Sequence, residues 1–485
     1  MGNDHRDNDA HTMKSFATSL LFALALVFPV TGSSAETFDL VIRGGRVMDP
    51  ETGLDAVREI GISDGKIAAI SESPLSGSEV IDAAGLVVAP GFIDLHQHAW
   101  DEESIRFKIR DGVTSLLELE VGTDDVDPWY RKYEGKLPLH FGVAVGHIPV
   151  RMRVMGDFPG FLPKADSKAA TIEATTAQIA EMKAGIARGL DAGAVAVGFG
   201  IRYTPAATRW EILEMFRAAA NYQASCHVHL RERGDRSIEA AQEVIACSAI
   251  TGAPLQIVHL QAIGASSTPK LLQMAAEAQT HDLDVTAEIY PWTAGMTDIS
   301  ASMFADGWRE EFGLDYGDLQ WGATGERLSE ETFRKYRETG GLVIVHSNPE
   351  SVVTEAIIHP ASMIASDGLV GHPRNAGTYA RILGHYVRER KELTLMEALR
   401  KITLMPAQRL EARAPMMKQM GRIQQGCVAD LTLFDPESVT ERATFTEPKE
   451  FSEGIPFVIV SGTVVVRHGE IVENALPGQA IRAHP

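Results

Sequence analysis

The stretch GFIDLHQHAW, from Gly91 to Trp100, is an apolar run that ends in two histidines, His96 and His98. Residues two apart in a strand point to the same face, so both imidazoles can point in one direction. A single histidine at a strand end is more often a hydrogen-bonded structural residue than a ligand. Whether this pair binds something therefore depends on what the rest of the chain brings to the same edge of the fold.

Further apolar runs follow this one, and amphipathic helical patterns separate several of them. Continuous apolar strands that alternate with helices indicate a parallel sheet covered on both faces. Such units over about 320 residues predict an α/β fold, a (β/α)8 TIM-type barrel. The alternative is an open doubly wound sheet, but no GxGxxG motif follows the first strand to favour it. The eight runs are GLVVAPGFIDLH, VTSLLELEV, LHFGVAVGH, AVAVGFG, ASCHVHL, LQIVHLQ, DVTAEIYP and ASMIASDG.

The two ends of the chain resemble each other and differ from the middle. FDLVIRGGRVMDP and REIGISDGKIAAI near the start, and GCVADLTLFDP and FVIVSGTVVVRHGEIV near the end, are β-rich with glycine turns. We expect a small β-sandwich built from residues 36–88 and 411–485, with a barrel at residues 89–410 between them. Residues from about 300 to 345 break the alternation and predict an insert between strands seven and eight. The run LVIVHS in this insert could instead be a barrel strand.

The N-terminus has the pattern of a secretory signal. Lys14 precedes an apolar stretch from Leu20 to Phe28, and Ser33-Ser34-Ala35 forms a small-x-small cleavage site. The apolar stretch is short for a membrane span, so a retained anchor is the less favoured alternative. We expect residues 1–35 to be a signal peptide that is removed, and the mature protein to be periplasmic without a stable membrane span.

Composition narrows the class of protein. The chain has 485 residues, of which 45% are hydrophobic and 23% charged, as is typical of a globular protein. A formal net charge of −20 disfavours a nucleic-acid partner. The cysteines Cys226, Cys247 and Cys427 have no close spacing, so no disulfide framework is expected. The sequence does not set the oligomeric state and leaves a homo-oligomer open.

The carboxyl ends of the predicted barrel strands carry the side chains of a metal site. In a parallel barrel these ends meet at one mouth, where catalytic groups lie. Imidazole and carboxylate are the ligands of Zn²⁺ and similar divalent cations. Two carboxylates in an apolar strand are costly unless a cation or hydrogen-bond donors neutralise them. The sequence therefore predicts a divalent-metal site at this mouth, drawn from His96, His98, Glu118, Glu120, His227, His229, His259 and Asp367.

Seven further motifs stand in order along the chain: VGHIPVRMRVMG, GFGIRYTPAA, HLRERG, IVHLQAIG, IYPWTAG, ASDGLVGHPRNAGTYARILGHYVR and GRIQQGCVADLTLFDP. Together with PGFIDLHQH they resemble the amidohydrolase superfamily and, within it, the N-acyl-D-amino-acid deacylase (D-aminoacylase) family. The resemblance covers nearly all of the mature chain. It implies the barrel, the small β domain, the insert before strand eight, and hydrolysis of N-acyl-D-amino acids with the help of one or two zinc ions.

The resemblance also implies roles for individual residues. His229 and His259 would hold a zinc ion tightly. His96 and His98 would line a second, weaker metal position. Asp367 would be the general acid/base.

One expected ligand is different in this chain. The family commonly has a cysteine in strand two, whereas this segment reads LELEV. Glu120 is the candidate replacement, because a carboxylate can bridge two metals through its two oxygens. Glu118 has the same parity but lies deeper in the strand and is the alternative. His227 is expected below the site, as a buried structural residue.

The substrate side of the site departs from the family as well. Family members often carry a lysine two residues after the strand-six histidine, which helps to hold the substrate carboxylate. Here Gln261 occupies that position and supplies no charge. Arg231 or Arg374 could do so, since arginine binds a carboxylate bidentately, although each could instead form a structural ion pair. The substrate-binding candidates are Tyr203, Arg231, Gln261, Tyr290, Arg374 and His147.

The sequence thus predicts a metal-dependent amide hydrolase that acts on a small N-acyl amino acid. Zinc lowers the pKa of its bound water from about 16 towards about 7. Asp367 would accept a proton as this hydroxide attacks the carbonyl carbon and would pass it to the departing nitrogen. The alternatives are another amide, such as an arylamide, a cyclic amide or a dipeptide, and a non-catalytic metal- or ligand-binding protein on the same fold. The presence of Asp367 argues against the non-catalytic alternative.

Overall fold

The computed structural model describes residues 37–483. The signal peptide predicted at residues 1–35 lies outside this range, so its removal and the export of the protein stay predictions. Within the described part of the chain, no helix has both the length and the apolar character needed to cross a membrane.

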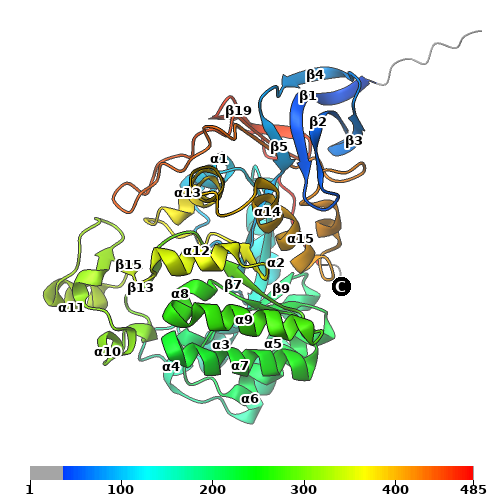
Figure 1. Ribbon diagram of the computed structural model, residues 1–485. Helices are drawn as coiled ribbons and strands as arrows, with labels where there is room; N and C mark the ends of the chain where they lie inside the picture. Colours follow the sequence, from blue (N-terminus) through cyan, green and yellow to red (C-terminus); the bar gives the residue numbers. More distant parts are fainter. Residues whose placement is uncertain (1–36, 484–485) are drawn as a thin grey trace, which may run out of the picture. The chain divides into compact units, whose positions relative to one another are not determined.

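The central element is a barrel of eight parallel strands (Figure 1). Neighbours in the barrel follow the order of the chain, and the first and last strands meet beyond their ends, where the His98 amide donates to the Gly368 carbonyl (3.0 Å). This order confirms the predicted (β/α)8 barrel, because the strand order of a doubly wound sheet reverses. The strands are β6 (Phe92–Asp94), β7 (Val113–Thr123), β8 (His140–Gly146), β9 (Ala196–Gly200), β10 (Ser225–His229), β11 (Leu255–Ile257), β12 (Val285–Ile289) and β16 (Ser362–Ile364).

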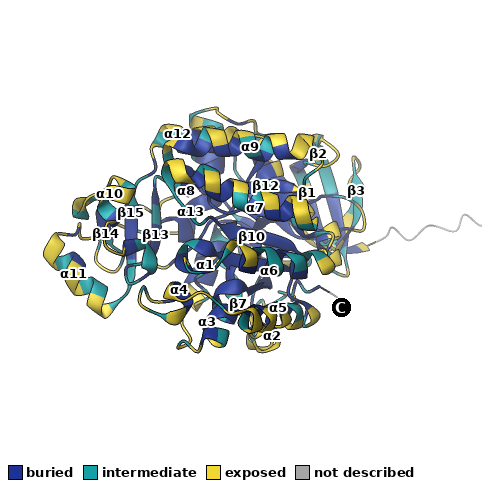
Figure 2. Cartoon of the chain, turned by 90° about the horizontal axis from the view of Figure 1, so that it is seen from below, coloured by how far each residue is buried: buried dark blue, intermediate teal, exposed yellow. Residues whose placement is uncertain are grey.

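Helices cover the outside of the barrel. Figure 2 shows buried strands inside and helices whose outer surfaces are exposed. In α5 the buried residues include Ile179, Met182, Ile186 and Leu190, a spacing that forms one apolar stripe, and Thr175 begins the helix with a capping box. The helices are α1 (Glu102–Arg110), α2 (Val126–Tyr133), α3 (His147–Met155), α4 (Lys168–Thr171), α5 (Thr176–Asp191), α6 (Arg209–Asn221), α7 (Ser237–Thr251), α8 (Leu260–Gly264), α9 (Thr268–Thr280), α12 (Glu350–Ile358), α13 (Arg374–Arg381), α14 (Leu395–Leu399) and α15 (Met405–Leu410).

The small β domain is built from both chain ends, as predicted. Its nine strands form one hydrogen-bonded sheet around an apolar core of its own, and β17 joins the two ends by pairing antiparallel with β5. The strands are β1 (Thr37–Asp49), β2 (Leu54–Ser63), β3 (Lys66–Ser71), β4 (Ser76–Asp82), β5 (Val87–Pro90), β17 (Leu431–Phe434), β18 (Phe457–Val460), β19 (Thr463–Arg467) and β20 (Glu470–Ile471).

Two details of the domain boundaries differ from the prediction. The run GLVVAPGFIDLH is two strands, β5 of the small sheet and β6 of the barrel, divided at Gly91. A Cβ atom at Gly91 would lie 2.1 Å from Thr114 Oγ1, so only glycine allows this close approach. The end of the chain also leaves the small domain, because the Ile481 amide donates to the Phe141 carbonyl (2.7 Å) and residues 479–481 run along β8.

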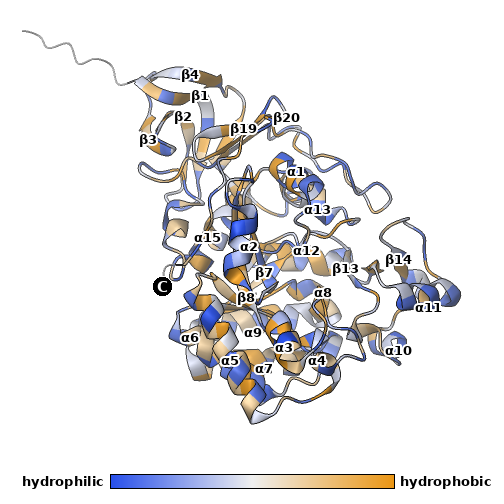
Figure 3. Ribbon diagram, turned by 180° about the vertical axis from the view of Figure 1, so that it is seen from behind, coloured by the Kyte–Doolittle hydropathy of each residue, from blue (hydrophilic) through white to orange (hydrophobic). Residues whose placement is uncertain are grey.

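The insert before the last barrel strand is a three-stranded antiparallel sheet with two helices. The run LVIVH is the strand β15 and pairs with β13 and β14, so it is not a barrel strand and the prediction of eight strands holds. The insert has a separate apolar core, and Figure 3 shows its helix α11 as strongly hydrophilic. Its sheet begins and ends slightly outside the predicted 300–345. Its elements are β13 (Ala294–Asp298), α10 (Trp308–Phe312), β14 (Leu319–Trp321), α11 (Glu330–Thr339) and β15 (Leu342–His346).

Candidate metal centre

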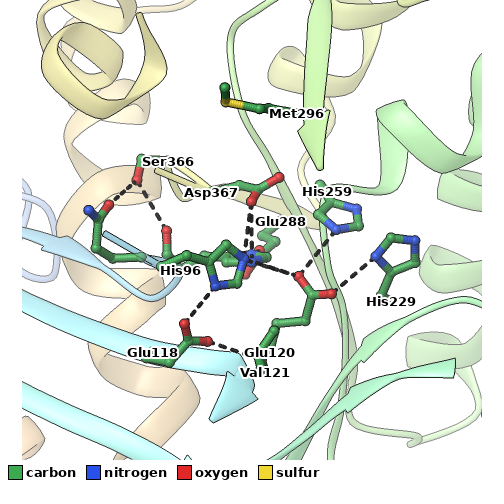
Figure 4. A network of polar contacts seen from close by, with 12 residues as sticks. His96, Glu118, Glu120, Val121, His229, His259, Glu288, Met296, Ser366 and Asp367 are labelled. Atoms are coloured by element: carbon green, nitrogen blue, oxygen red, sulfur yellow. Dashed lines mark hydrogen bonds and ion pairs between the residues drawn. The ribbon is translucent and has the colours of Figure 1, made fainter. Parts of the chain in front are cut away.

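Imidazoles and carboxylates from segments far apart in the sequence meet at the carboxyl end of the barrel (Figure 4). Their potential ligand atoms form two groups, each within 4.8 Å, and the two groups share Glu120. The structure therefore brings the five residues predicted as metal ligands together with the predicted general acid/base, whereas Glu118 and His227 belong to neither group. The first group is His96, His98, Glu120 and Asp367, and the second is Glu120, His229 and His259.

Glu120 lies at the centre of these side chains. Its Oε2 is 2.8 Å from His96 Nε2, 3.6 Å from His98 Nε2 and 3.4 Å from His259 Nε2. Its Oε1 is 3.1 Å from His229 Nδ1. Burial by itself would raise the pKa of Glu120, but hydrogen bonds from His229, His259 and His96 outweigh burial and hold this pKa well below its usual range. An ionised carboxylate between two sets of imidazoles is placed to bridge two cations.

Glu118 lies behind the histidines rather than between them. Its Oε2 accepts a hydrogen bond from His98 Nδ1 (2.6 Å), and its Oε1 accepts one from the Val121 amide (3.0 Å). A carboxylate that binds the outer nitrogen of a ligating histidine fixes the orientation of the ring and leaves the other nitrogen free for a metal. The Glu118 carboxylate is thus placed to orient His98, whereas Glu120 lies where the two groups of candidate ligand atoms meet.

Glu288 is a site residue that the sequence reasoning missed. It lies on β12, is 1% exposed, and its Oε1 contacts His96 Nδ1. It therefore orients His96 in the same way as Glu118 orients His98. The signal was present in the sequence, because the strand VTAEI carries a single carboxylate among mostly apolar residues, and such a group needs a partner.

Below the histidines, a fully buried Lys108 connects the first and last barrel strands. Its Nζ donates to Ser366 Oγ (2.6 Å) and lies 3.0 Å from Asp94 Oδ2. The other oxygen of Asp94 accepts the His96 amide (3.2 Å) and the Ser366 amide (3.0 Å). These bonds fix the backbone on both sides of the metal centre. The side chains that would bind a metal are therefore held in place before any metal ion or substrate is bound.

Asp367 follows β16 and faces the first group of ligand atoms. Its Oδ1 is 3.5 Å from His96 Nε2 and 3.4 Å from His98 Nε2, and its Oδ2 is 2.9 Å from Arg374 Nη1. Burial would raise the pKa of Asp367, but the charge of Arg374 and then that of His96 hold it well below its usual range. Asp367 has a φ of +51° and His259 a φ of +31°, so two residues of the site have the backbone strain that often marks function.

The donor set fits a divalent cation. The Nε2 atoms of His96 and His98 lie 3.0 Å apart, and the outer Nδ1 of each ring contacts a carboxylate. Burial would lower the pKa of His96, but the charges of Glu288 and Asp367 raise it well above its ordinary value. Two inward-facing nitrogens beside ionised carboxylates need a proton or a cation between them. Nitrogen and oxygen donors in this number are those of a zinc-type site.

The change Glu288→Gln is expected to weaken metal binding at the position that includes His96 by about 10- to 100-fold, because the carboxylate that fixes this ring is lost. A competition titration of zinc against a chromogenic chelator measures the effect. Glu338→Gln, an exposed change on α11, is the matched control and should leave zinc affinity unchanged. If the Glu288→Gln variant binds each equivalent of zinc as tightly as the unaltered protein does, Glu288 does not have the orienting role.

A cavity of about 800 Å³, including its open mouth, lies over the metal centre. Two of the predicted substrate-binding residues, Tyr203 and Tyr290, line it. The Tyr203 hydroxyl is 3.1 Å from Thr297 Oγ1, and its ring packs edge-on against His229 at 5.0 Å between centroids. Burial raises the pKa of Tyr203, so the group stays a hydroxyl that can donate a hydrogen bond.

Two predicted arginines do not line this cavity, because each is bound to a carboxylate elsewhere. Arg231 forms a two-point ion pair with Glu243 (2.7 and 2.9 Å) and faces a different groove. Arg374 is fully buried, pairs with Asp367 and lies over the Tyr290 ring at 4.7 Å. Both arginines were candidates to bind the substrate carboxylate. The structure instead shows the alternative for each of them, an ion pair with a carboxylate of the protein.

Two other predicted contacts are also absent from the cavity wall. The Gln261 amide is buried and donates to the Tyr290 carbonyl (3.0 Å). His147 is the first residue of α3, and its Nε2 is 2.7 Å from Glu211 in a buried cluster. His227 lies deeper in β10, where its Nε2 meets Ser225 Oγ at 3.1 Å, and it belongs to neither group of metal ligands.

The cavity wall instead carries Arg202 and Arg233, which the sequence reasoning did not select. Both lie against the ring of Phe312 from the insert, at 5.3 and 5.4 Å from its centroid. Arg233 belongs to the motif HLRERG, in which the sequence reasoning had selected Arg231, and only Arg233 of the two lines this cavity.

A barrel with imidazoles, carboxylates and an ionised aspartate at the carboxyl ends of its strands defines a site for metal-dependent catalysis. Comparison with known proteins narrows this class. Residues 337–466 match the family Amidohydro_3, the amidohydrolase family. The chain is 29% identical over 482 residues to the N-acyl-D-glutamate deacylase of Alcaligenes xylosoxydans xylosoxydans. The aligned region covers 89% of this chain and 94% of the relative. The chain is also 29% identical over 499 residues to the D-aminoacylase of the same organism, over 92% of this chain and 97% of the relative.

A solved structure agrees with these relatives. The N-acyl-D-glutamate deacylase from Bordetella bronchiseptica, complexed with zinc and a phosphonate inhibitor, superposes with a TM-score of 0.80 at 26% identity. The match covers 92% of this chain and 100% of that chain. The resemblance carried by the motifs is thereby confirmed: the chain is similar along nearly its whole length to the N-acyl-D-amino-acid deacylases.

Proposed function

We propose that the protein is a metal-dependent deacylase that removes the acyl group from N-acyl-D-amino acids, a hydrolase of carbon–nitrogen bonds other than peptide bonds. The observation that carries the proposal is the position of Asp367, an ionised carboxylate on the wall of the same cavity as Glu120, His98, His229 and His259. Storage or transport of a metal needs ligands but no proton acceptor beside them. The names of the relatives and the cavity volume, which suits a small ligand, support the proposal.

Zn²⁺ is the cation that we propose for the site. His229 and His259 would hold one ion with Glu120, and His96 and His98 would hold a second ion with the same carboxylate. When bound, zinc would supply Lewis acidity, which acidifies a water molecule and polarises the substrate carbonyl. The solved relative that contains zinc supports this choice.

The proton chemistry is the work of Asp367. Its Oδ1 faces the metal ligands and would take a proton from the attacking water and give it to the departing nitrogen. Arg374 binds the other oxygen, so it keeps the carboxylate ionised and limits its rotation. The Tyr203 hydroxyl lines the cavity next to His229 and is placed to donate a hydrogen bond to the acyl oxygen.

Apolar side chains form much of the remaining cavity wall. Phe161 packs edge-on against His98 at 5.1 Å between ring centroids. This surface suits an apolar acyl group or amino-acid side chain more than a second charge. The further apolar residues of the wall are Val121, Leu162, Leu230, Ile263, Met296, Met303, Phe312, Val345 and Leu369.

The test is a screen of N-acetyl-D- and N-acetyl-L-amino acids with zinc present, in which release of the free amine is measured. We expect hydrolysis of D-substrates, loss of activity after dialysis against a chelator, and recovery when zinc is returned. Activity confined to arylamides, cyclic amides or dipeptides would replace the proposed substrate by one of those. Stable metal binding without hydrolysis of any of these amides would favour a non-catalytic protein.

We also propose that the protein is exported after removal of residues 1–35, and that the mature form is periplasmic. The support is the signal pattern of the sequence. N-terminal sequencing of the protein from a periplasmic fraction tests this proposal, and a mature chain that still carries residues 14–34 would contradict it.

A further inference from the structure

Arg233 is a half-buried residue of the loop that follows β10, and it lines the cavity above the metal centre. Its Nε donates to the Ala262 carbonyl (3.0 Å), and its Nη2 donates to Ser347 Oγ of the segment after β15. These two bonds hold the guanidinium between the barrel and the insert. They use two of its five N–H donors, and the other three have no hydrogen-bond acceptor among residues 37–483.

The charge of Arg233 is also unbalanced. Among residues 37–483, no carboxylate lies within the 4.0 Å distance of an ion pair with Arg233. Its neighbour on the wall, Arg202, is paired with Glu311 (2.8 Å) and Glu232 (3.6 Å). Arg233 is half-buried, and burial lowers its pKa. A guanidinium withdrawn from water without an anion is costly, and an anionic ligand would remove that cost.

The residues from which a carboxylate anchor was expected are engaged elsewhere. Gln261 is uncharged, and its amide is committed to the Tyr290 carbonyl. Arg231 and Arg374 are bound to carboxylates of the protein. Of the arginines on the described cavity wall, Arg233 is thus the one whose charge is free for a ligand.

We infer that Arg233 binds the α-carboxylate of the substrate, and that the site takes N-acyl amino acids with an uncharged side chain. This inference rests on the proposed deacylase function and names its substrate class. A planar guanidinium binds a carboxylate through two parallel N–H bonds, which would place the substrate with its amide towards Asp367 and Glu120. A second carboxylate on the side chain would meet the apolar wall or the already paired Arg202.

The test compares N-acetyl-D-leucine with N-(3-methylbutyl)acetamide, the same amide without its carboxylate. The change Arg233→Gln is expected to lower kcat/KM for N-acetyl-D-leucine by about 10- to 100-fold, chiefly through KM, and to leave kcat/KM for the neutral amide unchanged. Arg233→Lys should restore part of the loss. Arg236→Gln, an exposed change three residues along the same loop, is the matched control and should behave like the unaltered enzyme.

A binding measurement makes the test independent of turnover. Calorimetry of N-acetyl-D-leucine with the zinc-loaded Asp367→Asn variant should give an affinity about 10- to 100-fold higher than with the Asp367→Asn/Arg233→Gln double variant. Equal affinities, or equal losses on the acid and the neutral amide, would overturn the role of Arg233 and leave the deacylase function intact. Faster hydrolysis of N-acetyl-D-glutamate than of N-acetyl-D-leucine would overturn the preference for an uncharged side chain. If the unaltered enzyme hydrolyses no N-acyl amino acid, the proposed function itself fails.

Discussion

The Asp367→Asn variant is expected to lose about 10²- to 10⁴-fold in kcat and to keep its bound metal. Asparagine has nearly the same shape as aspartate and can remain beside Arg374, but it cannot accept a proton. The Asp367 carboxylate is ionised at neutral pH, because the charges of Arg374 and His96 keep its pKa low despite its burial. The loss should therefore appear in the chemical step, and substrate binding should change little.

Three measurements on the same sample separate this loss from damage to the site. Elemental analysis gives the zinc content, thermal unfolding gives the stability, and calorimetry gives the affinity for N-acetyl-D-leucine. All three should stay close to those of the unaltered enzyme. A kcat like that of the unaltered enzyme would reject Asp367 as the general acid/base, and loss of zinc would instead make it a structural ligand.

The Glu120→Ala variant is expected to bind zinc more than about 100-fold more weakly, a larger loss than removal of an orienting carboxylate gives. The reason is geometric, since Glu120 is the one residue that both groups of ligand atoms share. Without it, the two pairs of imidazoles share no carboxylate, and His229 and His259 lose the carboxylate of their group. Zinc content after gel filtration, together with a chelator competition titration, measures the effect, and hydrolysis should be lost with the metal.

Two companion variants sharpen this test. Glu118→Ala removes a carboxylate of the same strand that contacts only His98 among the ligands, so it should weaken zinc binding less than Glu120→Ala does. Glu120→Cys should retain zinc better than Glu120→Ala, because a thiolate is a good zinc ligand. A larger loss of zinc in Glu118→Ala than in Glu120→Ala would move the bridging position to Glu118.

The sequence was sufficient to predict the barrel and to predict that the candidate metal ligands lie together, and the reason is periodicity. Parallel strands start and end together, so the histidines at the ends of the first, fifth and sixth apolar runs lie at the same mouth. The two-residue repeat of a strand then places His96 with His98, and Glu118 with Glu120, on shared faces. The order of Glu118 and Glu120 along β7 also indicated which of them lies nearer the centre.

Loops and strand interiors were less predictable. Arg231 and Arg233 are two residues apart in one loop. The motif HLRERG does not indicate that Arg231 forms an ion pair with Glu243 of α7 whereas Arg233 lines the cavity. Arg374 was a candidate to bind the substrate carboxylate, but the fold buries it completely and pairs it with Asp367. Such assignments depend on partners far away in the sequence, which a one-dimensional pattern does not contain.

Catalysis and substrate contact depend on different parts of the molecule. The metal ligands and Asp367 stand at the ends of barrel strands, whereas Met296, Met303, Phe312, Val345 and Ser347 on the cavity wall belong to the insert or its edge. Since the insert sheet has its own apolar core, mutations there can reshape the entrance without displacing a ligand atom. An enzyme organised in this way can acquire a new substrate range during evolution while its hydrolytic machinery is inherited intact.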